Sequence, residues 1–109
     1  GMAKQMIYTA RNIKAPEALR IGLVNAVYPI EELMVAAKKM ASMIASNAPI
    51  AVRNCKKAIN DGLQTDIESG VAIEEKLFGD CFETEDQRYG MAFFLDRNKD
   101  KVKEPFKNK

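Results

Sequence analysis

The 109-residue sequence contains no histidine and no tryptophan, and it has only two cysteines. Without histidine, the chain lacks the Ser-His and Cys-His pairs that activate most nucleophilic hydrolases, and it lacks a usual ligand of zinc sites. Cys55 and Cys81 are far apart in the sequence, form no CxxC pair, and each lies on the apolar side of a helical pattern. We therefore expect two buried thiols, with a disulfide or a catalytic thiol as the alternatives.

Long apolar runs are absent as well. No stretch of 18 apolar residues and no charged-then-apolar leader occurs, so neither a membrane span nor a secretory signal is expected, and the expected location is cytoplasmic. Seventeen Lys and Arg residues against fifteen Asp and Glu residues leave a net charge of only +2, which does not favour a strong polyanion binder. The length and the hydrophobic content of 47% are those of one globular domain, residues 1–109.

Apolar residues that recur every three or four positions predict a mainly helical chain. The first ten residues already have this spacing with no capping residue before them, so we expect the chain to be part of something longer. Further helices are expected to start near Ala15, to run from Ile30 to about Ser46, to run from Pro49 to Gly62, and to follow Asp66 or Thr65. The β-prone segment Leu23–Tyr28 is the one short extended segment that we expect.

Four of the six glycines lie at the ends or in the interior of the predicted helices. Gly22 and Gly62 are each followed by leucine, which predicts helix ends in the left-handed conformation. Gly70 and Gly79 fall inside the helix after Asp66, where glycine costs about 1 kcal/mol relative to alanine. They are expected to mark the close approach of another backbone or of a ligand. The inner face of that helix is predicted to contain Ile67, Val71, Phe78 and Cys81.

Three carboxylates, Glu83, Glu85 and Asp86, fall within four positions. Thr84 is followed three residues later by Gln87, the spacing of a capping box, so the stretch predicts the start of a helix. Negative charge in the first turn is then stabilised by the helix dipole, by about 0.3 to 1 kcal/mol. Consecutive residues in that turn point in different directions. We therefore expect solvated side chains and neither a metal site nor a catalytic acid.

Three segments together resemble the C-terminal third of the crotonase family, the enoyl-CoA hydratases, and look especially like the short-chain 3-hydroxybutyryl-CoA dehydratases. They are APEALRIGLVNAV, residues 15–27, APIAVRNCKKAINDG, residues 48–62, and LFGDCFETEDQRYGMAFF, residues 77–94. The resemblance implies the helical C-terminal domain of the crotonase fold, without its ββα spiral core. It also implies that the two catalytic glutamates and the oxyanion hole precede residue 1, so that this chain alone is inactive and contains no catalytic residue.

The resemblance further implies two coenzyme A-binding residues. Phe78 corresponds to the aromatic residue of the family's LF pair and is expected along the adenine or pantetheine arm. Arg97 corresponds to the cation after the GMxxF motif and is expected to pair with phosphate. Lys99 and Lys101 are further candidates for the same phosphates. The alternatives are a Phe78 that only packs in the core and an Arg97 that only interacts with the helix dipole.

An acyl-CoA substrate and a homo-oligomer, a trimer or a hexamer, are the partners that the resemblance implies, with no cofactor besides the coenzyme A of the substrate. A helical self-association module without a ligand is the alternative of a different class. The tail RNKDKVKEPFKNK, residues 97–109, has six basic and two acidic residues. It is either a solvated end or an anion-binding segment, and nucleic-acid binding through it is a third alternative that we do not expect, because no nucleic-acid-binding motif occurs.

Overall fold

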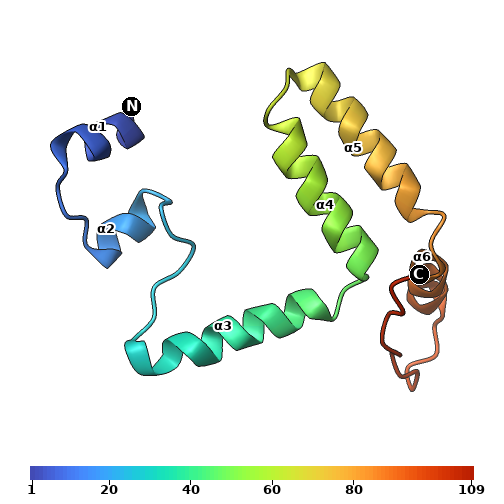
Figure 1. Ribbon diagram of the computed structural model, residues 1–109. Helices are drawn as coiled ribbons and strands as arrows, with labels where there is room; N and C mark the ends of the chain where they lie inside the picture. Colours follow the sequence, from blue (N-terminus) through green and yellow to red (C-terminus); the bar gives the residue numbers. More distant parts are fainter. The chain divides into compact units, whose positions relative to one another are not determined.

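The computed structural model describes all residues from 1 to 109 and contains six α-helices and no β-strand (Figure 1). The helices are α1 (Met2–Thr9), α2 (Ala15–Arg20), α3 (Ile30–Ala45), α4 (Pro49–Gly62), α5 (Ile67–Cys81) and α6 (Glu85–Leu95). The prediction of a mainly helical chain is confirmed. The chain divides into two compact units, Gly1–Lys39 and Met40–Lys109, which we describe separately. None of the six helices combines the length and the apolar character that crossing a membrane requires.

The first unit is organised by an ion pair and a helix end. The guanidinium of Arg11 donates hydrogen bonds to both carboxylate oxygens of Glu17, at 3.0 and 2.6 Å, and these contacts lower the pKa of Glu17. At the end of α2, Gly22 adopts a left-handed conformation with a φ of 73°. The N–H of Leu23 then donates to the carbonyl oxygen of Ala18 at 2.9 Å. The predicted glycine stop at Gly22 is confirmed.

No strand forms between α2 and α3. Residues 23–25 are bends, and residues 26–29 have no regular secondary structure. The Ala18 carbonyl oxygen accepts the N–H groups of both Leu23 and Val24, at 2.9 and 3.4 Å. The start of the segment Leu23–Tyr28 is therefore used to close the preceding helix, and its β-prone composition finds no second strand with which to pair.

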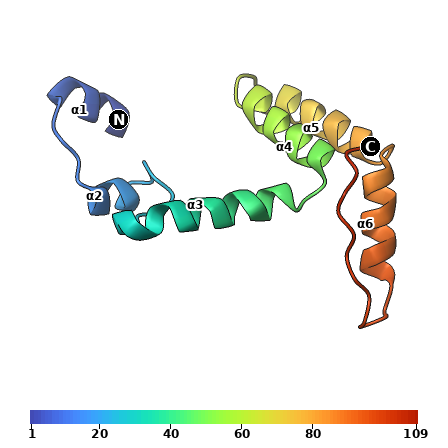
Figure 2. The ribbon, with the colours of Figure 1, turned by 60° about the horizontal axis from the view of Figure 1, so that its bottom comes forward.

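Helices α4 and α5 lie side by side and form the centre of the second unit (Figures 1 and 2). A Cβ atom placed on Gly70 would lie only 3.2 Å from the carbonyl oxygen of Gly62. The close approach predicted at Gly70 is thus confirmed, whereas a Cβ atom on Gly79 would meet nothing within 4 Å. The predicted left-handed stop at Gly62 is wrong, because α4 ends on Leu63 in the right-handed conformation, with φ −70°. Gly62 serves the helix contact instead.

The face of α5 that meets α4 differs from the predicted one. Leu77 is the buried residue of α5, whereas the side chains of Ile67, Val71 and Phe78 are 80%, 53% and 66% exposed. Residues spaced by three, four or seven share a helix face. Leu77 therefore shares its face with Gly70, and the close contact at Gly70 turns this face toward α4. Of the residues predicted for the inner face, Cys81 is partly buried beside Leu77, whereas Ile67, Val71 and Phe78 lie beside that face and are uncovered within this chain.

The first turn of α5 is capped by Asp66. Its carboxylate accepts hydrogen bonds from the backbone N–H of Ser69 at 2.9 Å and from the Ser69 hydroxyl at 2.8 Å. The contacts from Ser69 lower the pKa of Asp66. Of the two caps that the sequence allows, Asp66 is confirmed.

Replacing Asp66 by asparagine is expected to keep the cap, because asparagine caps helices equally well, and to remove a pH dependence. A folded-state pKa below the unfolded value contributes stability above the ordinary carboxyl pKa of about 4, and that contribution is lost as the pH falls through the folded value. Urea unfolding followed by circular dichroism between about pH 6 and pH 2 is the measurement. A variant that loses stability on acidification as steeply as the unmodified chain would contradict this account.

Candidate functional site

A groove of about 320 Å³ runs between α4 and α5. Phe78 lies along it, and the Phe78 ring meets the Phe82 ring edge to face, with centroids 5.1 Å apart. Since two thirds of Phe78 is exposed, the aromatic face is available to a ligand and does not pack in a core of this chain. The groove is lined by Asn54, Cys55, Ala58, Ile59, Glu74, Leu77, Phe78 and Cys81.

Both thiols line this groove, and both are free. Cys81 is partly buried and donates to the carbonyl oxygen of Leu77 at 3.3 Å. The amide of Asn54 donates to the same carbonyl oxygen at 3.0 Å and thereby ties α4 to α5. Cys55 is exposed, so the prediction of two buried thiols is wrong for Cys55. The reason is that its place on α4 turns it toward the open groove.

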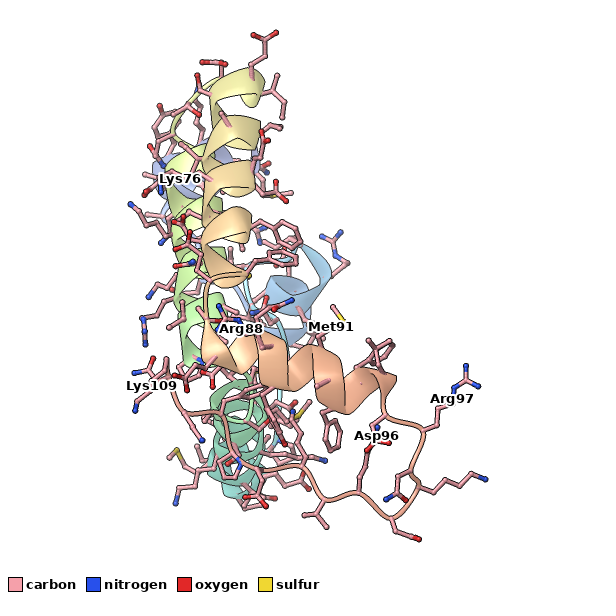
Figure 3. The ribbon with its side chains drawn as sticks, turned by 90° about the vertical axis from the view of Figure 1, so that its right-hand side faces the viewer. Lys76, Arg88, Met91, Asp96, Arg97 and Lys109 are labelled. Carbon is pink, nitrogen blue, oxygen red and sulfur yellow. The ribbon has the colours of Figure 1, made fainter.

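Arg97 follows α6 and extends away from the helix into solvent (Figure 3). Its guanidinium takes part in none of the four ion pairs of the chain. Lys101 is differently placed. Its ammonium donates to the carbonyl oxygens of Phe93 and Asp96 at the end of α6 and lies 4.4 Å from the centre of the Phe93 ring. Arg97 is therefore free to meet an anion, whereas the Lys101 ammonium is engaged within the chain.

The acidic stretch starts a helix, as predicted. The Thr84 hydroxyl oxygen accepts the N–H of Gln87 at 3.1 Å, and α6 begins one residue after Thr84. Nowhere in the chain do three side chains of the metal-ligating types come together. The stretch is therefore a capped helix start.

Asp86 departs from the prediction of a solvated side chain. It is only 2% exposed, and its two carboxylate oxygens accept the backbone N–H groups of Lys107 and Asn108, at 2.6 and 2.7 Å. Its own N–H donates to the carbonyl oxygen of Lys109 at 3.1 Å. Asp86 is buried because the end of the chain folds back over the first turn of α6. Reasoning from the sequence did not find this contact.

Residues 104–109, which we call the strap, run beside α6 (Figure 2). The Tyr89 hydroxyl oxygen accepts the N–H of Glu104 at 2.6 Å, and the Tyr89 and Phe106 rings meet edge to face, with centroids 5.8 Å apart. The Phe106 ring packs over Gly90, where a Cβ atom would lie 3.5 Å from the ring, an ordinary packing distance. The end of the tail is therefore held against α6, although Phe106 is the one partly buried side chain of the strap and the others are exposed. The choice between a solvated end and an anion-binding segment for residues 97–109 stays open.

Comparison with known proteins shows which family this chain is similar to. The family model for enoyl-CoA hydratase/isomerase matches residues 1–106. The chain is 55% identical over 109 residues to the short-chain-enoyl-CoA hydratase of Clostridium acetobutylicum, covering 100% of this chain and 41% of that protein. It is 52% identical over 99 residues to the crotonyl-CoA hydratase of Syntrophomonas wolfei, covering 91% of this chain and 38% of that protein.

Solved structures agree with the sequence comparison. The enoyl-CoA hydratase from Bacillus anthracis matches with a TM-score of 0.90 and 38% identity, covering 100% of this chain and 41% of that one. The chain thus spans about two fifths of the length of these relatives. It matches the C-terminal part of the hydratases, which confirms the expected helical C-terminal domain of the crotonase fold. The chain belongs to the enoyl-CoA hydratase/isomerase family.

Proposed function

We propose that this chain forms the C-terminal helical part of a hydratase that adds water reversibly to a short-chain 2-enoyl-CoA thioester. The observation that carries the proposal is the 55% identity across all 109 residues to a protein named short-chain-enoyl-CoA hydratase. The likeness to the Bacillus anthracis enoyl-CoA hydratase, with a TM-score of 0.90, supports the same reaction class.

Within this function, the residues of the chain bind the substrate and do not react with it. Hydration of a conjugated thioester needs one group to activate water, one to deliver a proton, and donors for the thioester oxygen. Glu74 is the one carboxylate that lines the α4–α5 groove, and a single carboxylate does not fill these roles. The paired glutamates and the oxyanion hole would come from the part of a hydratase that this chain does not match.

Phe78 and Arg97 are the residues that we propose to contact coenzyme A, which enters as part of the substrate and not as a separate cofactor. The exposed Phe78 ring on the groove offers an apolar face to the adenine or the pantetheine arm. Arg97 presents a planar fork of N–H donors, free of ion pairs within the chain, to a phosphate.

Homo-oligomerisation, as a trimer or a hexamer, belongs to the same proposal. Its support is the set of uncovered apolar side chains on α3, among them Met34, Val35 and Met43, which are 61%, 70% and 63% exposed. Exposed apolar side chains of this kind would be covered either by a neighbouring subunit or by the part of a hydratase that this chain does not match, so the number of subunits is to be measured on a longer chain. A helical module that only self-associates would share this property, so light scattering alone does not separate the two, whereas hydratase activity does.

A chimaera tests the proposed function. The N-terminal part of the Clostridium acetobutylicum hydratase that this chain does not match is joined to residues 1–109. The chimaera is expected to consume crotonyl-CoA, measured as loss of the ultraviolet absorbance of the conjugated thioester, at least ~10³-fold faster than either part alone. Hydration by residues 1–109 alone, or a folded chimaera without activity, would contradict the proposal.

A further inference from the structure

Asp86 is the buried carboxylate of the second unit, and the proposed reaction does not use it. Glu85, beside it in the same helical turn, is exposed. The dipole of α6 is available to both carboxylates, so it does not explain why Asp86 is the one covered. What distinguishes Asp86 is its pair of hydrogen bonds, at 2.6 and 2.7 Å, from the backbone of Lys107 and Asn108.

The backbone around Asn108 is shaped for a carboxylate. Asn108 has a φ of 61°, a left-handed conformation that asparagine tolerates better than most residues. Consecutive N–H groups that turn inward around such a residue form a concave anion site. Here both N–H groups meet the Asp86 carboxylate, at the distances of strong charge-assisted bonds. The side chain of Asn108 also accepts a hydrogen bond from Arg53 of α4 at 2.7 Å, so the same residue joins the strap to α4.

Two further contacts hold the chain between α6 and the strap. Lys101 binds the carbonyl oxygens of Phe93 and Asp96, and the Tyr89 hydroxyl accepts the N–H of Glu104. Lys101 thus holds the turn that contains Arg97 to the end of α6, and Tyr89 holds the start of the strap. Figure 3 shows Arg97 and Lys109 at opposite ends of α6.

We propose that Asp86 is a latch, a positioning residue that holds the strap on α6 and through it fixes the turn that contains Arg97. When the latch is released, the strap leaves α6, and Lys101 alone then holds the turn that contains Arg97, so that Arg97 is positioned less firmly. The consequence for coenzyme A binding rests on the proposed function, whereas the contact between Asp86 and the strap does not.

The test uses the hydratase chimaera with Asp86→Asn, matched by Glu85→Gln. Glu85 lines the same small cavity between α6 and the strap as Asp86, but its side chain forms no hydrogen bond to the strap, so the control removes a charge from the same turn and leaves the strap's hydrogen bonds in place. Asparagine would turn an N–H group toward one of the two strap N–H donors and would leave that donor unsatisfied. We expect amide hydrogen exchange in residues 104–109 to rise at least ~10-fold in Asp86→Asn, and KM for crotonyl-CoA to rise about 5-fold, with kcat within about 2-fold. Glu85→Gln should match the unmodified chimaera in all three.

Removing Lys107–Lys109 provides a second variant in case Asp86→Asn disturbs folding. This truncation should raise KM at least as much as Asp86→Asn does, because it removes both hydrogen bonds of the Asp86 carboxylate and also the contact between Arg53 and Asn108. Adding Asp86→Asn to the truncated chimaera should cause no further rise, because the partners of the carboxylate are already gone. Unchanged exchange in Asp86→Asn, additive effects on KM, or a loosened strap with unchanged KM would each overturn the proposal. An inactive chimaera would count against the proposed function only, since the exchange measurement still decides whether Asp86 holds the strap.

Discussion

Gly70→Leu is expected to destabilise the α4–α5 pair by a net amount of about 1 to 2 kcal/mol, since overpacking a close contact costs up to about 3 kcal/mol. Even the first carbon of a side chain would lie 3.2 Å from the Gly62 carbonyl oxygen, and a backbone atom in a helix cannot move aside as a side-chain tip can. This loss should exceed the gain of up to about 1 kcal/mol that leucine brings by its higher helix propensity. Urea unfolding of the chain, followed by circular dichroism, measures the change.

Gly79→Leu is the matched control, because it makes the same exchange in the same helix where a Cβ atom meets nothing within 4 Å. We expect it to be neutral or to stabilise the chain by up to about 1 kcal/mol. The two variants should therefore differ in the free energy of unfolding by about 1 to 3 kcal/mol, with Gly70→Leu the less stable of the two. Equal shifts would show that the helix contact at Gly70 is not what constrains this position.

Arg97→Ala in the hydratase chimaera is expected to raise KM for crotonyl-CoA by about 10-fold or more, with kcat within about 2-fold. A hydrogen bond to a charged group contributes about 1.5 to 3 kcal/mol, and each 1.4 kcal/mol corresponds to a factor of ten. Binding that is equally strong in the ground state and the transition state changes KM and leaves kcat unchanged. Phe78→Ala should act in the same direction through lost stacking on the groove.

Lys76→Ala serves as the control for these two variants. Lys76 is a cation on α5, with its side chain 75% exposed, and it forms a salt bridge to Asp80 one helical turn later. Its removal changes the charge of the second unit by as much as Arg97→Ala does, and it should leave KM unchanged. If Arg97→Ala leaves KM unchanged, or if Lys76→Ala raises KM equally, a specific phosphate contact at Arg97 is refuted.

The sequence predicts local features of this fold well, because their causes are local. Thr84 caps α6 through the N–H of Gln87, three residues away, and Gly22 ends its helix within the same turn. Periodic apolar residues likewise predict where helices occur. They do not fix which stripe is covered, since that depends on the neighbouring helix. The contact at Gly70 turned Leu77 inward and left Phe78 outside.

The candidate site could likewise be predicted from the sequence only in part. Phe78 and Arg97 come from a resemblance to a family, and their contacts with coenzyme A stay a prediction. The structure adds that both side chains are accessible in this chain. Asp86 could not be found from its sequence neighbours, because the residues that bury it lie 21 and 22 positions later. The helix dipole alone explains a carboxylate in the first turn of a helix, so nothing in the neighbouring sequence indicates the contact with the strap.

Gly62 and Gly70 contact each other, but the two positions differ in how much room they leave for a side chain. A Cβ atom on Gly70 would press on a backbone oxygen at 3.2 Å, whereas one on Gly62 would meet its neighbours at 3.6 and 3.7 Å, which is ordinary packing distance. Alanine therefore fits at position 62, where it also suits a helix better, and it does not fit freely at position 70. In an alignment of related chains, one close crossing of two helices would thus leave one conserved glycine column and one variable column.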